Sequence, residues 1–134
     1  MRSIFNGTDV VGIIGISYKQ LQYWDKTNFI KPSAIHMGRY RKYTFADLVL
    51  MQVTKLMREQ DVSIQRLRKV IQALEDLLPK VGYPLSELSF LISGVRVLVF
   101  NGDVLMNKGA PGEFFFQVKS LRDKVDKQFP DVAE

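Results

Sequence analysis

The fold of this chain is decided by residues 15–33, which read GISYKQLQYWDKTNFIKPS. Gly15 is the residue type that most readily adopts a left-handed backbone, so it predicts a tight turn that ends a preceding short helix. Ser17 and Gln20 have capping-box spacing, in which a hydroxyl and a side-chain amide each bond a free backbone N–H. A second helix is therefore expected over residues 18–27.

This second helix is expected to have an apolar face and a polar face. Leu21 and Trp24 lie three residues apart and predict the buried face. The other faces carry polar and aromatic side chains: Lys19, Gln22, Tyr23 and Lys26. A short helix over residues 10–14, capped by Thr8 or Asp9, is expected to precede the turn, and the chain before it is expected to be a loose lead-in. Two short helices joined by a tight turn predict a helix-turn-helix.

A basic hairpin is expected to follow the two helices. Pro32 forbids a continued helix, and residues 33–43 are polar and basic, with Gly38 as the expected turn of a short wing. Cations and aromatic residues are interleaved along it: Arg39, Tyr40, Arg41, Lys42 and Tyr43. The second helix of a helix-turn-helix enters the major groove, and a basic wing can contact phosphates or the minor groove. This arrangement predicts DNA binding.

The remaining pattern completes an α+β fold. Thr44 and Asp47 have capping-box spacing and open a helix that ends near Gln60. Ser63 caps a further helix, with Ile64, Leu67, Ile71, Leu74 and Leu78 expected to face inward, which stops at Pro79. We thus expect a winged helix-turn-helix domain over residues 1–79, with four helices and a β-hairpin wing. A small antiparallel β-rich segment with a closing helix, residues 80–134, is expected to follow it.

Within the second segment, strand and turn signals alternate. Residues 88–100 are rich in β-branched and aromatic side chains with Ser-Gly in the middle, which predicts two short strands and a tight turn. A further strand is expected over residues 113–118 and a closing helix over residues 120–129. Because side chains alternate faces along a strand, the run Phe114–Phe116 should turn one side to the core and the other to the closing helix or to another subunit.

Composition excludes several function classes. The 134 residues contain no cysteine and one histidine, His36, so disulfides, structural zinc sites and soft-metal sensors are excluded. No nucleophile–base set or phosphate-binding loop is present, so no enzymatic activity, cofactor or metal is expected. No apolar stretch approaches the ~20 residues of a membrane span, and a cytoplasmic, nucleoid-associated protein is expected.

Charge is distributed unevenly along the chain. The net charge is +5. Residues 1–72 hold 12 Lys and Arg against 5 Asp and Glu, whereas residues 73–134 hold 7 against 9. The first part would be attracted to a polyanion by counterion release, and the second would not. The uneven charge supports a nucleic-acid partner for the N-terminal domain.

The same stretches resemble a known family of regulators. Residues 15–33 resemble the MerR signature, in which a Gly-Val-Ser-like turn, a Leu-x-Tyr-Trp recognition helix and a Lys/Arg-Pro pair follow one another. Residues 39–48, RYRKYTFADL, resemble the family's wing and the start of its third helix. Residues 58–67, REQDVSIQRL, resemble its turn into the fourth helix. The resemblance covers residue 9 to about residue 78.

The chain also departs from the family pattern. Gln22 stands where many members have an arginine that binds phosphate, so one electrostatic contact is missing. Arg39 and Asp61 replace glycines common in the wing and between the third and fourth helices. After Pro79 the chain has a β-rich tail in place of a long coiled-coil helix and sensor segment, so the family's metal and redox chemistry does not carry over.

The resemblance implies a sequence-specific transcription regulator that binds double-stranded DNA as a homodimer on a two-fold operator, with RNA polymerase as a further partner. An excisionase-like factor that bends DNA for a recombinase is the alternative. The residues expected to contact DNA lie on the recognition helix and the wing: Ser17, Tyr18, Lys19, Gln22, Tyr23, Lys26, Arg39, Tyr40, Arg41 and Lys42. The tail is expected to supply the apolar surface for dimerisation.

Overall fold

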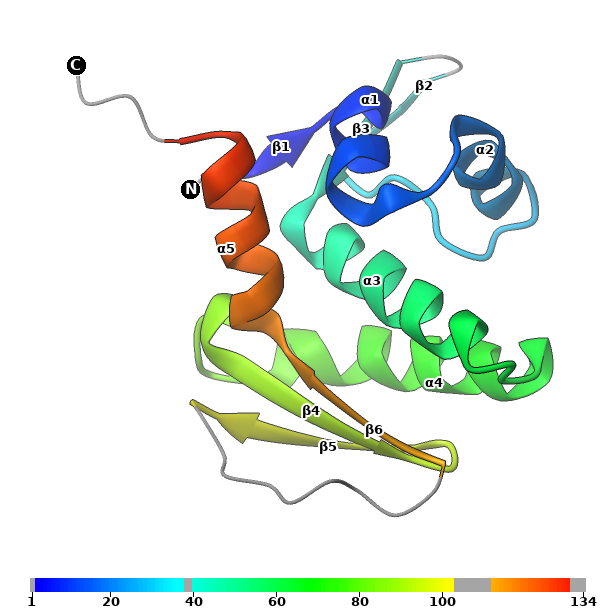
Figure 1. Ribbon diagram of the computed structural model, residues 1–134, viewed down its shortest axis with the longest axis vertical. Helices are drawn as coiled ribbons and strands as arrows, with labels where there is room; N and C mark the ends of the chain where they lie inside the picture. Colours follow the sequence, from blue (N-terminus) through cyan, green and yellow to red (C-terminus); the bar gives the residue numbers. More distant parts are fainter. Residues whose placement is uncertain (1, 38–39, 103–111, 131–134) are drawn as a thin grey trace. The chain divides into compact units, whose positions relative to one another are not determined.

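The computed structural model describes residues 2–37, 40–102 and 112–130, which form five α-helices and two three-stranded antiparallel sheets (Figure 1). They divide into two compact units, residues 1–52 with 123–134 and residues 53–122. Helices α3 (Phe45–Glu59) and α5 (Val118–Gln128) each contribute to both units. The α+β class is confirmed, while the domain boundary expected after residue 79 stays a prediction. Over the described ranges, no helix has the length and apolar character required to span a bilayer.

The first helix of the first unit is α1 (Gly7–Val10), which continues as the π-helical turn η1 (Val11–Gly15). The prediction that Thr8 or Asp9 caps this helix is wrong. The cap is Asn6, whose side chain accepts a hydrogen bond from the Asp9 backbone N–H at 2.8 Å, while the Asp9 carboxylate accepts one from the Asn6 N–H at 3.0 Å. Asn6 has an extended backbone, as a capping residue requires, and Asp9 is its partner three residues later.

Helix α2 (Tyr18–Lys26) follows the turn and matches the prediction within one residue. Gly15 has a φ of +79°, which confirms the expected left-handed turn. The Ser17 hydroxyl accepts a hydrogen bond from the Gln20 backbone N–H at 3.0 Å and caps the helix. A Cβ on Gly7 would lie 3.0 Å from a Tyr18 ring carbon, so glycine there permits the close approach of α1 to α2. Together the two helices form a helix-turn-helix.

A small sheet completes the first unit. Strands β2 (Ile35–Met37) and β3 (Tyr40–Thr44) form the expected antiparallel hairpin, although Gly38, its expected turn, lies outside the described residues. The expectation of a loose lead-in is wrong, because strand β1 (Ile4–Phe5) pairs with the other edge of β3. Burial of the Phe5 side chain supports this pairing, and its ring meets that of Phe129 edge-on at 6.3 Å.

In the second unit, helix α4 (Ile64–Leu77) begins after Asp61, a non-glycine residue with φ +58°, and after the Ser63 cap. It ends in a 3₁₀ turn, η2 (Leu78–Lys80), that contains Pro79. Its buried face consists of Leu67, Val70, Ile71 and Leu74. The expectation that Ile64 faces inward is wrong: its side chain is 43% exposed. Helical side chains point back toward the N-terminus, so that of the first residue extends beyond the packed turns.

The sheet of the second unit follows a 3₁₀ turn, η3 (Leu85–Glu87), and has the order β5-β4-β6. Its strands are β4 (Leu88–Ser93), β5 (Arg96–Asn101) and β6 (Glu113–Gln117), all of which the sequence predicted. Val118, expected to end the last strand, instead begins α5. Gly94 takes the left-handed position of the β4–β5 turn with φ +61°.

Helix α4 lies along one face of this sheet (Figure 1). Arg66 links α4 to the sheet by donating hydrogen bonds to the Gly94 carbonyl at 2.6 Å and to the Gly112 carbonyl at 3.0 Å. Its guanidinium also lies 5.7 Å from the centre of the Phe114 ring. The face that turns toward α4 is therefore the one that carries Phe114. On the same face, the rings of Phe90 and Phe116 stack at 6.1 Å.

Candidate nucleic-acid interface

Helix α2 presents a continuous polar face to solvent. Every residue of α2 and its cap that the sequence assigned to DNA contact is exposed: Ser17, Tyr18, Lys19, Gln22, Tyr23 and Lys26. The two aromatic side chains on this face are strongly exposed to solvent, Tyr18 by 47% and Tyr23 by 61%. Exposed apolar surface that is contiguous on one face is a common feature of interaction sites, so this face is the candidate binding surface.

The opposite face of α2 is anchored in the core. Leu21 and Trp24 are buried, as predicted, and the Trp24 ring lies 6.5 Å from that of Phe29. The chain leaves the helix through Asn28, which has a φ of +59°, and the Phe29 backbone N–H then bonds the Trp24 carbonyl at 2.8 Å. Both ends of α2 are therefore fixed, and its exposed side chains are held on a rigid support.

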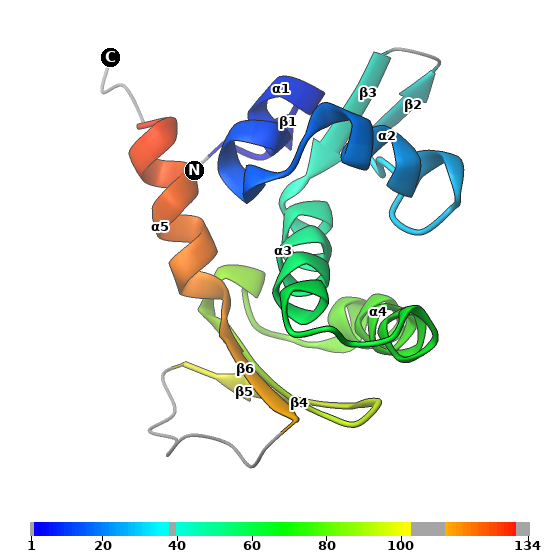
Figure 2. The ribbon, with the colours of Figure 1, turned by 45° about the vertical axis from the view of Figure 1, so that its right-hand side comes forward.

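The β2–β3 hairpin lies beside α2 (Figure 2). Arg41 and Lys42 are both partly exposed, and they point to opposite faces of strand β3 because they are neighbours on it. For Tyr40 the structure describes the backbone, which pairs with Met37. Arg39 lies outside the described residues. Of the four hairpin residues predicted to contact DNA, two therefore have described side chains, and one of these, Arg41, turns toward α2.

An ion pair joins the hairpin to the helix. Arg41 Nε lies 2.7 Å from Asp25 Oδ2, and the Asp25 side chain is only 4% exposed. Asp25 occupies the last turn of α2, where the helix dipole disfavours a negative charge, and burial disfavours it further. The guanidinium of Arg41 compensates both effects. Sequence reasoning missed this pair, although Asp25 follows the buried Leu21 by four residues and so lies on the same helix face.

A second polar cluster ties the segment after α2 to the start of α3. Oδ2 of Asp47 accepts hydrogen bonds from the Ser33 N–H at 2.9 Å, the Ser33 hydroxyl at 2.8 Å and the Thr44 N–H at 2.9 Å. The Asp47 N–H in turn donates to the Thr44 hydroxyl at 3.2 Å, which confirms the predicted capping box. The bonds to Ser33 connect residues 14 apart in sequence. Asp47 thereby holds together the segment before β2, through Ser33, and the end of β3, through Thr44.

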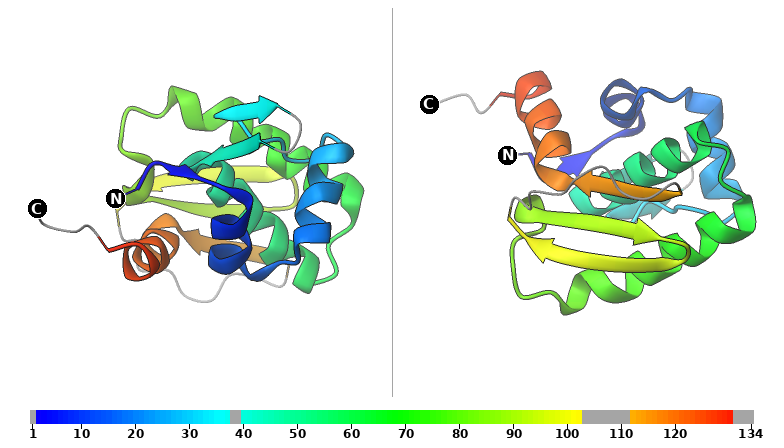
Figure 3. Two further views of the ribbon diagram at one scale, coloured as in Figure 1. Left: turned by 90° about the horizontal axis from the view of Figure 1, so that it is seen from above. Right: turned by 60° about the horizontal axis from the view of Figure 1, so that its bottom comes forward.

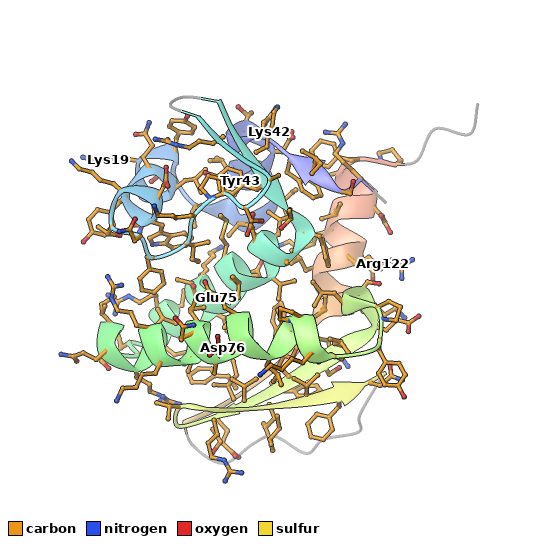
Figure 4. All side chains as sticks on the ribbon, turned by 180° about the vertical axis from the view of Figure 1, so that it is seen from behind. Lys19, Lys42, Tyr43, Glu75, Asp76 and Arg122 are labelled. Atoms are coloured by element: carbon orange, nitrogen blue, oxygen red, sulfur yellow. The ribbon has the colours of Figure 1, made fainter. Side chains whose placement is uncertain are left out.

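Tyr43, on β3 between these two clusters, is 1% exposed and lies inside the unit, whereas Lys19 extends outward from α2 (Figure 4). Burial, and next the negative charge of Asp25, raise the pKa of Tyr43 to about 12 from its ordinary value of 10.0. The phenol therefore stays neutral throughout the physiological range. Its role is to fill the core beneath the hairpin.

The raised pKa of Tyr43 predicts a loss of stability in alkali. Below pH 10 the phenol is protonated in both the folded and the unfolded chain. Between pH 10 and about 12 the unfolded chain loses this proton while the folded chain keeps it, so stability falls as pH rises, by ~1.4 kcal/mol per pH unit at most. Tyr43→Phe should remove this part of the slope in urea unfolding measured between these values.

Tyr23→Phe is the matched control, because Tyr23 is 61% exposed. It should leave the alkaline slope as in the original protein. If stability of the Tyr43→Phe variant fell with pH as steeply as that of the original protein, the alkaline loss of stability would not come from Tyr43.

Comparison with known proteins points to one family. Residues 5–74, just over half of the chain, match the model of the MerR HTH family of regulatory proteins. The chain is 30% identical over 73 residues to HTH-type transcriptional regulators of Mycobacterium bovis and Mycobacterium tuberculosis. The aligned region is 52% of this chain and 32% of each relative, so the chain matches about a third of their length. The chain therefore belongs to the MerR family of helix-turn-helix regulatory proteins, a family of DNA-binding transcription regulators and not of enzymes.

Proposed function

We propose that this chain reads a specific double-stranded DNA sequence as a homodimer on a two-fold operator. Helix α2 enters the major groove, and the β2–β3 hairpin acts as the wing that contacts the backbone. Arg39, Tyr40, Arg41 and Lys42 are the proposed wing contacts. The observation that carries the proposal is the exposed polar and aromatic face of α2 on a firmly anchored helix next to this hairpin.

The side chains on α2 divide into two kinds of contact. Gln22 can form a bidentate hydrogen bond with adenine or bond a phosphate, and Tyr18 and Tyr23 can combine apolar contact with a hydroxyl hydrogen bond. Lys19 and Lys26 add positive charge for the sugar-phosphate backbone. The Ser17 hydroxyl already caps α2, so its further contact with phosphate would come at the helix N-terminus, where anions are favoured.

The homodimer follows from the size of the reading surface. A single helix and hairpin reach few base pairs, and single DNA-binding modules bury about 600–1,000 Å² of protein surface, less than larger dimers bury. Two copies related by a two-fold axis double the contacts and read an inverted repeat. The spacing of the half-sites then reports the geometry of the dimer.

Selection from a random duplex library at physiological salt tests the proposal. We expect one inverted repeat to be enriched, and a Gln22→Ala variant to relax the preference at a single position of each half-site, at a cost of about 1–3 kcal/mol in discrimination. Enrichment of direct repeats would instead favour an excisionase-like bending factor. Binding without any enrichment would contradict sequence reading by α2.

A further inference from the structure

The last turns of helix α5 belong to the unit that contains the helix-turn-helix. From Asp123 onward the chain clusters with residues 1–52, although α5 follows directly on strand β6 of the second unit. Figures 1 and 3 show these turns beside the start of β1. The match to the MerR family covers residues 5–74 and does not include this segment. Its contacts within the first unit therefore belong to this chain and not to the family pattern.

Phe129, the residue after α5, packs against the edge strand of the first sheet. Its backbone N–H bonds the Val125 carbonyl at 2.8 Å, which holds it in line with the helix. Its ring meets that of Phe5 edge-on at 6.3 Å, and Phe5 is fully buried. Strand β1 is shorter than the usual length of about three to ten residues, so it gains little from backbone pairing alone. Apolar contact with Phe129 therefore helps to keep β1 on the edge of β3.

The end of α5 also contacts the first helix of this unit. The guanidinium of Arg2 lies 4.2 Å from the centre of the Phe129 ring and 3.5 Å from the carboxylate of Asp9, which belongs to the capping box of α1. On the turn η1, a Cβ at Gly12 would lie 2.8 Å from Nε2 of Gln128, so glycine there lets the Gln128 side chain lie against the turn. The strand β1 and the helix α1 with its turn are thus both in contact with the end of α5.

Strand β1 and helix α1 in turn support the two elements that are proposed to read DNA. β1 pairs with β3, the strand that carries Arg41 and Lys42. α1 approaches α2 closely, since a Cβ at Gly7 would lie 3.0 Å from a ring carbon of Tyr18. The end of α5 is therefore one contact away from the wing and one contact away from the recognition helix.

We infer that Gln128 and Phe129 are positioning residues for DNA binding, in a C-terminal clamp formed by residues 123–130. The clamp holds β1 and α1, and through them the hairpin and α2, in the arrangement that binds DNA. This inference rests on the proposed function for what the hairpin and α2 bind. Without the clamp, the binding arrangement is present for only a fraction of the time, and the apparent affinity falls by that fraction.

Phe129→Ala in the full chain tests the clamp. The probe is a fluorescent duplex that carries the inverted repeat enriched by selection, titrated under conditions in which circular dichroism shows the variant folded. We expect binding roughly tenfold weaker than that of the original protein. Phe129→Tyr keeps the ring and should bind as the original protein does. A lower urea midpoint for Phe129→Ala with unchanged affinity of the folded variant would overturn the inference.

Phe114→Ala is the matched control. It removes a ring of the same size that also lies near an arginine, Arg66 at 5.7 Å, but in the second unit. It should leave the affinity for the duplex unchanged. Equal weakening by Phe114→Ala and Phe129→Ala would overturn the inference, because the loss would then follow from general destabilisation.

A reversible disulfide can replace the lost contact, because the chain contains no cysteine of its own. A Cβ at position 12 would lie 3.8 Å from Cδ of Gln128, so Gly12→Cys and Gln128→Cys place two thiols within reach of each other. In the Phe129→Ala background, the oxidised protein should recover the lost affinity and the reduced protein should not. A closed disulfide without any gain in affinity would overturn the inference, also where the reduced variant is too unstable to titrate.

Amide hydrogen exchange without DNA separates this inference from the proposed function. Phe129→Ala should speed exchange in β1, β3 and α1 by roughly tenfold or more and leave the strands β4–β6 unchanged. If exchange in β1 and α1 does not change while the chain still selects a DNA sequence, the clamp is overturned and the function stands. If exchange changes as expected but the original protein selects no DNA sequence, the clamp holds the first unit together and the function fails.

Discussion

Replacing Asp47 with alanine is expected to lower the free energy of unfolding by about 3–5 kcal/mol. One oxygen of this buried carboxylate accepts three hydrogen bonds, two from Ser33 and one from Thr44, and hydrogen bonds to a charged group contribute about 1.5–3 kcal/mol each. Alanine would also leave the backbone N–H groups of Ser33 and Thr44 without their acceptor, which adds a desolvation cost.

The measurement is urea unfolding followed by circular dichroism, with Asp9→Ala as the matched control. Asp9 holds the same place in the capping box of α1 as Asp47 holds in that of α3, but it accepts one backbone bond, from Asn6 at 3.0 Å, and one longer bond from the exposed Arg2 side chain at 3.5 Å. Loss of these two bonds should cost about 1 kcal/mol. Equal losses in the two variants would show that the bonds to Ser33 add nothing to stability.

The bonds of Asp47 illustrate what the sequence could predict. Thr44 and Asp47 are three residues apart, and their capping box was predicted because both partners and their spacing are local. The same holds for the Ser17 cap, the turn at Gly15 and the buried face of α2. Ser33 also binds Asp47, but the two are 14 residues apart and no local rule connects them.

The incorrect predictions also arose where local sequence patterns do not decide the structure. Strand β1 contains only Ile4 and Phe5, too few residues to show an alternating pattern, and it exists because β3 offers a free edge. The first cap was assigned to Thr8 or Asp9 because several capping residue types follow one another there. Only the backbone of Asn6, extended at ψ 176°, decides among them.

For the candidate interface, the residues of α2 were predictable and the electrostatics of the hairpin were not. The exposed face of α2 follows directly from the positions of Leu21 and Trp24. The sequence also indicated a basic hairpin, but it gave no reason to assign different roles to the cations of Arg41 and Lys42. Strand alternation sends them to opposite faces, and the buried Asp25 on α2 engages Arg41.

Arg41→Ala is expected to lower the free energy of unfolding by about 3 kcal/mol. Removing one partner of a buried ion pair leaves the other charge uncompensated, at a cost of about 3–5 kcal/mol, and the lower end applies because the Arg41 side chain is 25% exposed. Lys42→Ala is the matched control, since it removes a neighbouring cation from the same strand without touching Asp25. It should change stability by less than about 0.5 kcal/mol.

A double-mutant cycle isolates the ion pair. Asp25→Asn removes the buried charge, so adding Arg41→Ala to it should cost much less than Arg41→Ala alone. Strictly additive losses would contradict a direct interaction. In DNA binding, Arg41→Ala and Lys42→Ala should each flatten the dependence of affinity on salt by about one unit of slope, because each removes one positive charge from the hairpin. The two variants would then bind DNA alike and unfold differently, which would show that Arg41 both contributes charge to DNA binding and holds the hairpin to α2, whereas Lys42 only contributes charge.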